Sequence, residues 1–210
     1  MTNTGKSSTN SDVDLTAKQC TEGNTNNLKP VDNHIPVTDT KTTPEPTDDW
    51  EKDVWLMASR MAILYMEMAK AIVSRLGEDE GKELIKSAVW KYGNICGEKV
   101  RNGVIEKGLP VIPENYNEIP DLPLKGWRSE TVEEPSGKKE TRITFCPLAA
   151  VWKEYGETGL GRLYCWVDQA KFNGYSPGLT CTHTCNVLDG DPYCVIDVHR
   201  VKDQANSHES

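Results

Sequence analysis

The sequence has no apolar run that approaches the roughly 18 residues of a transmembrane helix, and its lysines and arginines never form a basic stripe. The formal net charge is −8 at pH 7. Nucleic acids and anionic membranes carry negative charge themselves and bind poorly to such a chain. We therefore expect a protein that has neither a nucleic-acid nor a membrane partner and acts on a small molecule, in an oligomeric state that the sequence does not indicate.

The N-terminus also lacks the charged start and apolar segment that are typical of a secretory signal peptide. The chain has seven cysteines, an odd number, whereas the disulfide framework of a secreted domain normally uses an even one. These two features predict reduced thiols and a cytoplasmic protein.

Aromatic residues are missing from residues 1–46, which are rich in Thr, Asn, Ser, Asp and Pro. Such a segment cannot bury enough surface to offset the entropy that it would lose on ordering. We predict a disordered polar leader over residues 1–46, one small-molecule enzyme domain over residues 47–202, and a disordered tail over residues 203–210. A domain of that size fits a single hydrophobic core.

Apolar residues at helical spacing predict two long helices in the first half of the domain, from Asp48 to Gly77 and over residues 79–104. Asp48 and Glu51 have the spacing of a capping box. Gly93 and Gly97 lie four apart, so the second helix should let another backbone or a ligand come close. The first helix also carries four methionines, which we interpret as core residues rather than as a pocket wall: Met57, Met61, Met66 and Met68.

The second half of the domain alternates hairpins with short helices. Prolines interrupt every period over residues 108–124, which predicts an irregular connector. A hairpin over residues 126–146, two short helices over residues 148–155 and 160–172, and a second hairpin follow it. This order predicts an α+β fold, with a helical N-terminal half packed on a small antiparallel sheet of hairpins.

The second hairpin is predicted to turn at Asp189-Gly190, because these residues tolerate the positive φ of a two-residue turn. Paired positions then sum to 379. This register places Cys194 opposite Cys185 and Thr182 opposite Asp197.

The cysteines and the histidine of this hairpin raise the hypothesis of a metal site. Residues 181–185 read Cys-Thr-His-Thr-Cys, so the side chains of Cys181, His183 and Cys185 should share one face of a strand. Neighbours two apart on a strand are roughly 6.5–7 Å apart, which stretches a zinc site with metal–sulfur bonds of about 2.3 Å. We therefore predict no metal and no cofactor.

Short motifs between Phe145 and Cys194 carry a family resemblance. They are Phe145-Cys146-Pro147, Trp152 with Gly156, the run 163–168, the turn 173–177, and the run 188–194. Together they resemble the L-2-amino-thiazoline-4-carboxylic acid hydrolase family, over residues 49–199. The resemblance implies hydrolytic opening of a non-peptide C–N bond in a small cyclic amidine or related heterocycle. A cyclase or isomerase of a secondary metabolite and a non-catalytic ligand- or metal-sensing domain stay open as alternatives.

Hydrolysis of an amidine needs a nucleophile, a proton for the departing nitrogen and a group that holds the cation. Cys146 precedes a predicted helix start, where amide N–H groups should lower the pKa of its thiol, so it is the candidate nucleophile. Asp168 can hold an amidinium or act as a general base, or it can be an exposed helical residue. His183 and Cys194 are candidate supporting groups. Tyr164, Trp152 and Trp166 have aromatic faces that suit the walls of a substrate pocket.

Overall fold

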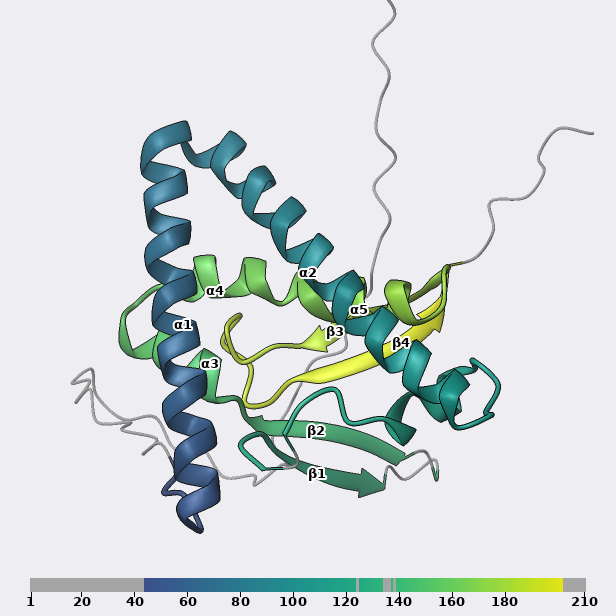
Figure 1. The fold of residues 1–210 in the computed structure, drawn as a ribbon. Helices are drawn as coiled ribbons and strands as arrows, with labels where there is room; N and C mark the ends of the chain where they lie inside the picture. Colours follow the sequence, from purple (N-terminus) through teal and green to yellow (C-terminus); the bar gives the residue numbers. More distant parts are fainter. Residues whose placement is uncertain (1–43, 124, 134–136, 138, 202–210) are drawn as a thin grey trace, which may run out of the picture.

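The structure is a computed structural model that describes residues 44–123, 125–133, 137 and 139–201 (Figure 1). Of the predicted leader only residues 44–46 fall within this range, and the predicted tail lies outside it. The helices are α1 (Asp49–Leu76), α2 (Glu78–Glu106), the 3-10 turn η1 (Pro113–Glu118), α3 (Pro147–Glu154), α4 (Thr158–Tyr164) and α5 (Trp166–Tyr175). The strands are β1 (Arg128–Glu133), β2 (Lys139–Phe145), β3 (Leu179–Cys185) and β4 (Val195–Arg200). The predicted α+β fold is confirmed.

Helices α1 and α2 form a hairpin whose arms diverge from Gly77 (Figure 1). The predicted cap of α1 is present, because the Asp48 carboxylate accepts a hydrogen bond from the Glu51 amide at 2.8 Å. The Glu51 carboxylate in turn pairs with Arg128 Nε at 3.2 Å. This contact ties the start of α1 to β1. No helix in the described part of the chain combines the length and the apolar character that a membrane span requires.

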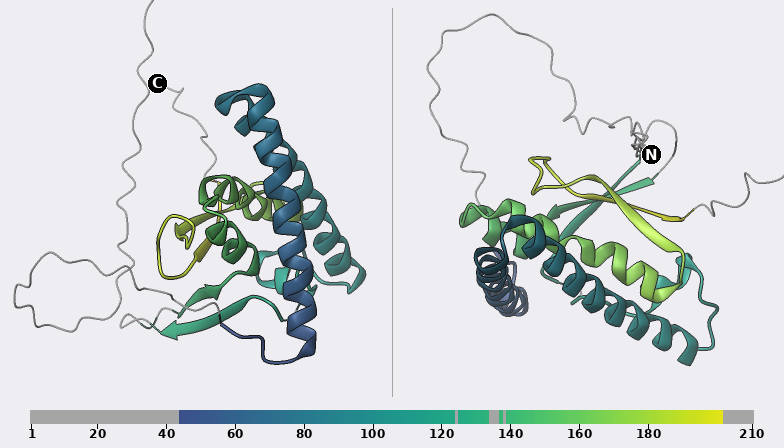
Figure 2. Two further views of the ribbon diagram at one scale, coloured as in Figure 1. Left: turned by 90° about the vertical axis from the view of Figure 1, so that its left-hand side faces the viewer. Right: turned by 90° about the horizontal axis from the view of Figure 1, so that it is seen from above.

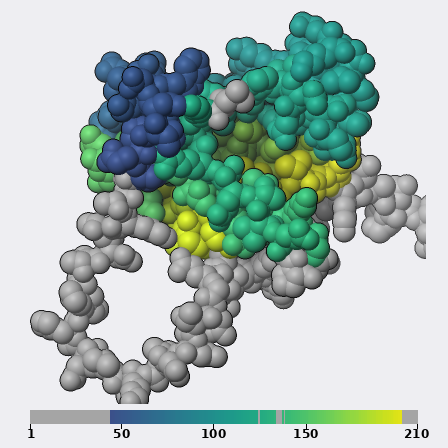
Figure 3. All heavy atoms as spheres, turned by 90° about the horizontal axis from the view of Figure 1, so that it is seen from below, coloured from purple at the N-terminus to yellow at the C-terminus, as the bar shows by residue number. Residues whose placement is uncertain are grey.

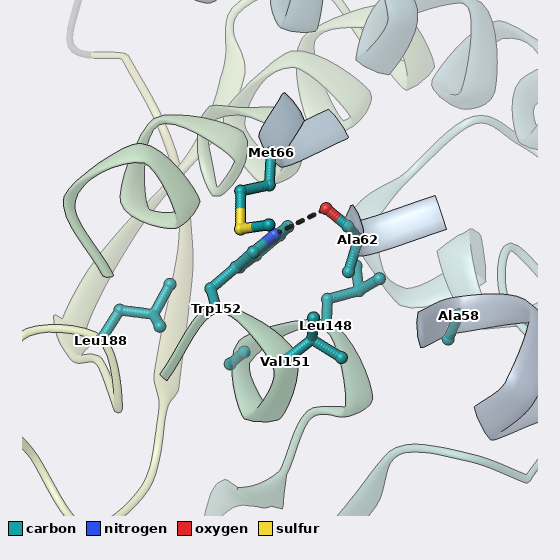
Figure 4. Close-up of a cluster of buried hydrophobic side chains, with 8 residues drawn as sticks. Ala58, Ala62, Met66, Leu148, Val151, Trp152 and Leu188 are labelled. Atoms are coloured by element: carbon teal, nitrogen blue, oxygen red, sulfur yellow. Dashed lines mark hydrogen bonds between the residues drawn. The ribbon is translucent and has the colours of Figure 1, made fainter. Parts of the chain in front are cut away.

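The buried face of α1 is lined by small residues. Ala58, Ala62 and Ala69 are buried there together with Met66. Trp152 of α3 packs against Ala58, Ala62 and Met66 and donates a hydrogen bond from Nε1 to the Ala62 carbonyl at 3.1 Å (Figure 4). The interpretation of the methionines as core is wrong for three of the four: Met57, Met61 and Met68 are 66%, 39% and 57% exposed. Alanines face the core because they let the bulky indole reach the helix backbone.

Helices α2 and α5 pack side by side with their backbones close together (Figures 1 and 2). A Cβ atom on Gly97 would lie 1.9 Å from the Lys171 carbonyl oxygen, and one on Gly93 would lie 2.5 Å from the Ala170 Cβ. The predicted close approach at these glycines is therefore confirmed, with a helix as the partner. It fixes α5, which carries Asp168 and Lys171.

The helix predicted over residues 160–172 is two helices, α4 and α5, which meet at Cys165. Hydrogen bonds from the Cys165 amide to Arg162 and from the Asp168 amide to Cys165 span three residues, so the chain is wound more tightly there than in an α-helix. Asp168 consequently lies in the first turn of α5 rather than late in a helix. At that end the helix dipole stabilises a carboxylate.

The strands form two separate antiparallel pairs, β1 with β2 and β3 with β4. Thr182 pairs with Asp197 as predicted, but a bulge after His183 places Val195 opposite Cys185, so the prediction for Cys194 is wrong. Cys194 instead bridges to Ile143 of β2 through two backbone hydrogen bonds of 2.9 Å, which links the two pairs.

The connection from β3 to β4 is also longer than the two-residue turn predicted at Asp189-Gly190. Asn186 stabilises this connection through two hydrogen bonds. Its backbone N–H donates to Asp191 Oδ2 at 2.7 Å, and its side-chain Oδ1 accepts from the Leu188 backbone N–H at 2.9 Å. A side chain that satisfies the loop backbone in this way removes the need for a tight turn.

Candidate active site

A cavity of about 140 Å³ lies between α1, α2, α3, α5 and the β3–β4 connection. Five of the predicted site residues line it: Cys146, Trp152, Tyr164, Asp168 and Cys194. Asp121, Lys171, Tyr92, Cys96 and Trp127 line it as well. Its walls are thus aliphatic side chains, thiols and aromatic rings, with charge confined to Asp121, Asp168 and Lys171.

The charged groups form one connected network. Lys171 Nζ lies 3.1 Å from Asp168 Oδ1 and 3.0 Å from Asp121 Oδ2, and Tyr116 donates its hydroxyl to Asp121 Oδ2 at 3.2 Å. Burial raises the pKa of Asp168, but the positive charge of Lys171 and the hydrogen bond from His183 outweigh it and hold that pKa below its usual value. Burial lowers the pKa of Lys171, and Asp168 and Asp121 more than reverse this, so the amine stays charged.

His183 lies behind Asp168 and does not line the cavity. Its side chain is 3% exposed, and its Nε2 lies 3.0 Å from Asp168 Oδ2. Because an ionised carboxylate only accepts hydrogen bonds, the shared proton is on Nε2. The buried Nδ1 atom has no hydrogen-bond partner among the described residues. His183 therefore holds and orients the Asp168 carboxylate rather than facing the space where a ligand fits.

Cys146 is the N-cap residue of α3, as the sequence suggested, but its thiol is not activated in the free protein. Burial raises the pKa of Cys146 to about 11, although the amides of Leu148 and Ala149 and the indole of Trp127 act in the opposite direction. The expectation of a lowered pKa is wrong because desolvation of the thiolate exceeds the contribution of the helix start.

Three further free thiols line the same cavity: Cys96, Cys165 and Cys194. Cys194 Sγ accepts a hydrogen bond from the Val187 amide at 3.4 Å, and burial raises the pKa of Cys165 to about 12. The described residues contain no group of three or more His, Cys, Asp or Glu side chains that could hold a metal ion. Cys185 is disulfide-bonded, so the expectation of uniformly reduced thiols does not hold at that residue.

Aromatic side chains support one wall of the cavity. The rings of Tyr65, Trp152 and Tyr164 contact one another with centroids 5.0 to 5.5 Å apart. Burial raises the pKa of the Tyr164 phenol, which stays neutral. Trp166, by contrast, lies outside this cavity: it is 40% exposed, and Lys86 Nζ lies 5.7 Å from its ring.

Sequence reasoning missed Lys171 and Asp121. Lys171 follows Asp168 by three residues on the same helix, a spacing that pairs opposite charges and could have revealed it. Asp121 lies in the irregular connector, where no periodicity indicates which way a side chain points. The structure shows its ion pair with Lys171 of α5, which the sequence of the connector does not indicate.

No curated protein and no solved structure matches the chain. One family model does match, over residues 56–197, and it is described as L-2-amino-thiazoline-4-carboxylic acid hydrolase. The match covers the domain except for a few residues at each end, and it includes Asp121, Cys146, Asp168, Lys171, His183 and Cys194. By this match, the chain belongs to the L-2-amino-thiazoline-4-carboxylic acid hydrolase family.

Proposed function

We infer that the protein is a hydrolase that opens a non-peptide C–N bond of a small cyclic amidine of the aminothiazoline carboxylate type. The observation that carries this proposal is the cavity itself, which brings the Cys146 thiol and the Asp168 carboxylate to the walls of one small space. The family match supports hydrolase chemistry. The charges that the cavity offers support the substrate class.

The charged groups of the cavity suit a cation that also carries a carboxylate. Two carboxylates, Asp121 and Asp168, outnumber the single ammonium of Lys171, so an amidinium gains a partner there. An ammonium has three N–H donors, and Asp121 and Asp168 occupy two of those on Lys171. The third is available for the carboxylate of the substrate.

Substrate binding has to activate Cys146, since a thiol with a pKa of about 11 is a thiolate to only about one part in 10⁴ at pH 7. An amidinium next to the sulfur favours the thiolate by charge attraction. In the first step the Sγ–C bond forms, the π electrons of the C=N bond move to nitrogen, and the thiol proton ends on that nitrogen. The C–N bond then breaks, and water adds at the same carbon and releases the thiol.

The test is product analysis with an aminothiazoline carboxylate in water enriched in ¹⁸O. Hydrolysis incorporates the label into the ring-opened product, whereas a cyclase or an isomerase gives an unlabelled product. A sensing domain binds the compound and returns it unchanged. Either of the last two results would overturn the proposal.

A further inference from the structure

A second hollow adjoins the reaction cavity. This outer groove has a volume of about 510 Å³, and the residues that line it alone are Trp50, Asp53, Val54, Met57 and Ala58 of α1 and Pro123 of the connector. It shares four further lining residues with the cavity: Met61, Tyr92, Leu122 and Trp127. The groove and the cavity are therefore adjacent, with these four side chains at their boundary.

We propose that the outer groove binds an apolar substituent of the substrate whose amidine head lies in the cavity. The inner cavity of about 140 Å³ is smaller than the roughly 300–1,000 Å³ of a typical ligand site, and the groove brings the combined space into that range. The proposal rests on the proposed function for the identity of the head. It assigns to the substrate a part that a bare aminothiazoline ring lacks.

The exposed side chains of α1 support this occupant. Trp50 and Met57 are large apolar residues that the core does not use, and both line the groove. An indole face covers flat apolar groups, and a flexible thioether adapts to irregular ones. Met57 and Met61, which were predicted to lie in the core, line the groove instead, whereas Met66 is buried in the core.

Both walls of the groove are held in place. Trp55 of α1 donates a hydrogen bond from Nε1 to the Gly126 carbonyl at 2.9 Å, and Glu51 pairs with Arg128. These contacts fix α1 against residues 125–128, and Figure 3 shows the start of α1 beside the connector on this face. These contacts therefore hold the two walls of the groove at a fixed distance from each other.

Polarity changes from the cavity to the adjacent groove. The cavity holds Asp168, Lys171 and Asp121, whereas the groove has Asp53 as its one charged side chain among the described lining residues. An amphiphilic ligand with a cationic head and an apolar tail matches this gradient. A fully polar ligand would leave the groove surface wet, without the gain from apolar burial.

The experiment compares the affinities of two probes for the full chain by calorimetry: acetamidine, which is a head alone, and octanamidine, which adds a tail. A fully buried methylene raises the affinity about fourfold, and an open groove buries about half of the surface of each methylene. Since octanamidine has about six methylenes more than acetamidine, it should bind at least ~30-fold more tightly. Met57→Ala should weaken octanamidine by at least ~3-fold and leave acetamidine unchanged. Leu64→Ala is the matched control, because Leu64 is on the same helix and 62% exposed but does not line the groove.

A tail gain below ~3-fold, or a gain that Met57→Ala leaves intact, would overturn the groove assignment. Octanamide, the neutral counterpart of octanamidine, separates this failure from failure of the proposed function. If octanamide binds as tightly as octanamidine, the cavity does not recognise an amidinium and the proposed head is wrong. The effect of Met57→Ala on octanamide then still decides whether the tail lies in the groove.

Discussion

At the scale of single residues, burial sets the protonation state of Cys146, the proposed nucleophile. Cys146 has amide N–H groups around its sulfur, which favour a thiolate, yet burial desolvates the thiolate and raises the pKa to about 11. In the free protein the thiol is therefore mostly protonated at neutral pH. In the proposed mechanism the positive charge of the substrate favours the thiolate, so activation of the thiol depends on binding.

Replacing the nucleophile tests this account directly. Cys146→Ser should lower turnover by at least ~10²-fold while the circular dichroism spectrum stays unchanged, because a hydroxyl is a far weaker nucleophile than a thiolate. Cys96→Ser is the control, since Cys96 lines the same cavity without capping a helix. A fully active Cys146→Ser enzyme would leave water, activated by Asp168, as the nucleophile.

The hydrogen bond from His183 should be visible in the pH profile. His183→Phe removes a donor to the Asp168 carboxylate, so the pKa of Asp168 should rise and the acid limb of kcat/KM should move toward neutral pH. His199→Phe removes an exposed imidazole from β4 and should leave the limb in place. An unchanged acid limb in His183→Phe would show that His183 serves packing alone.

The sequence indicated the residues of the cavity that stand next to recognisable local patterns. Cys146 precedes Pro147 at a strand-to-helix junction, and Asp168 interrupts an apolar helix. Asp121 gave no such signal because its role depends on where an irregular connector passes in space. The sign of the shift at Cys146 was also out of reach, since it depends on how deeply the thiol is buried.

At the scale of elements, the spacing of apolar residues gave the extents of the helices better than their orientation. α1 begins at the predicted cap and ends at Gly77. Its buried face, however, is formed mainly by alanines, and most of its large apolar residues lie on other sides of the helix. Periodicity cannot distinguish an apolar stripe that meets the core from one that lines a ligand groove. The register of the second hairpin failed only beyond the bulge.

The glycine contact between α2 and α5 carries a stability prediction. Gly97→Ala would place a methyl group within 1.9 Å of the Lys171 carbonyl, so the helices must separate, at a cost on the order of 3 kcal/mol. Thermal unfolding should show a fall in Tm of roughly 6–12 °C for a domain of this size. Turnover should fall too, because α5 carries Asp168.

Gly159→Ala is the matched control for this substitution. A Cβ atom on Gly159 of α4 meets nothing within 4 Å, and alanine has the higher helix propensity by about 1 kcal/mol. Its Tm should therefore stay level or rise slightly. Equal losses in the two variants would mean that the close approach of α2 and α5 contributes nothing specific.

At the scale of the whole molecule, the network in the cavity joins segments that are distant in the sequence. Asp121 comes from the connector, Asp168 and Lys171 from α5, and His183 from β3. The connector, α5 and β3 thus meet at the proposed site. Changes in the charge of this network should register in global unfolding as well as in catalysis.

The pH dependence of stability tests this coupling. A carboxyl group whose pKa is lowered by folding stabilises the native state above its ordinary pKa of about 3.9, and this stabilisation is lost as the pH falls through the lower folded value. Asp168→Asn should therefore unfold more easily than the wild type near pH 7, by on the order of 3 kcal/mol, because Lys171 and His183 lose a mostly buried partner. The two proteins should converge in denaturant titrations as the pH drops below about 4, since the wild type alone then loses the charge at this position.

Asp49→Asn is the control, because that carboxylate is 96% exposed in its pair with Lys52 and should change the free energy of unfolding by less than about 1 kcal/mol. Parallel curves for Asp168→Asn and the wild type between pH 7 and pH 3 would contradict a stabilising ionised Asp168 and would leave it a role in the reaction alone.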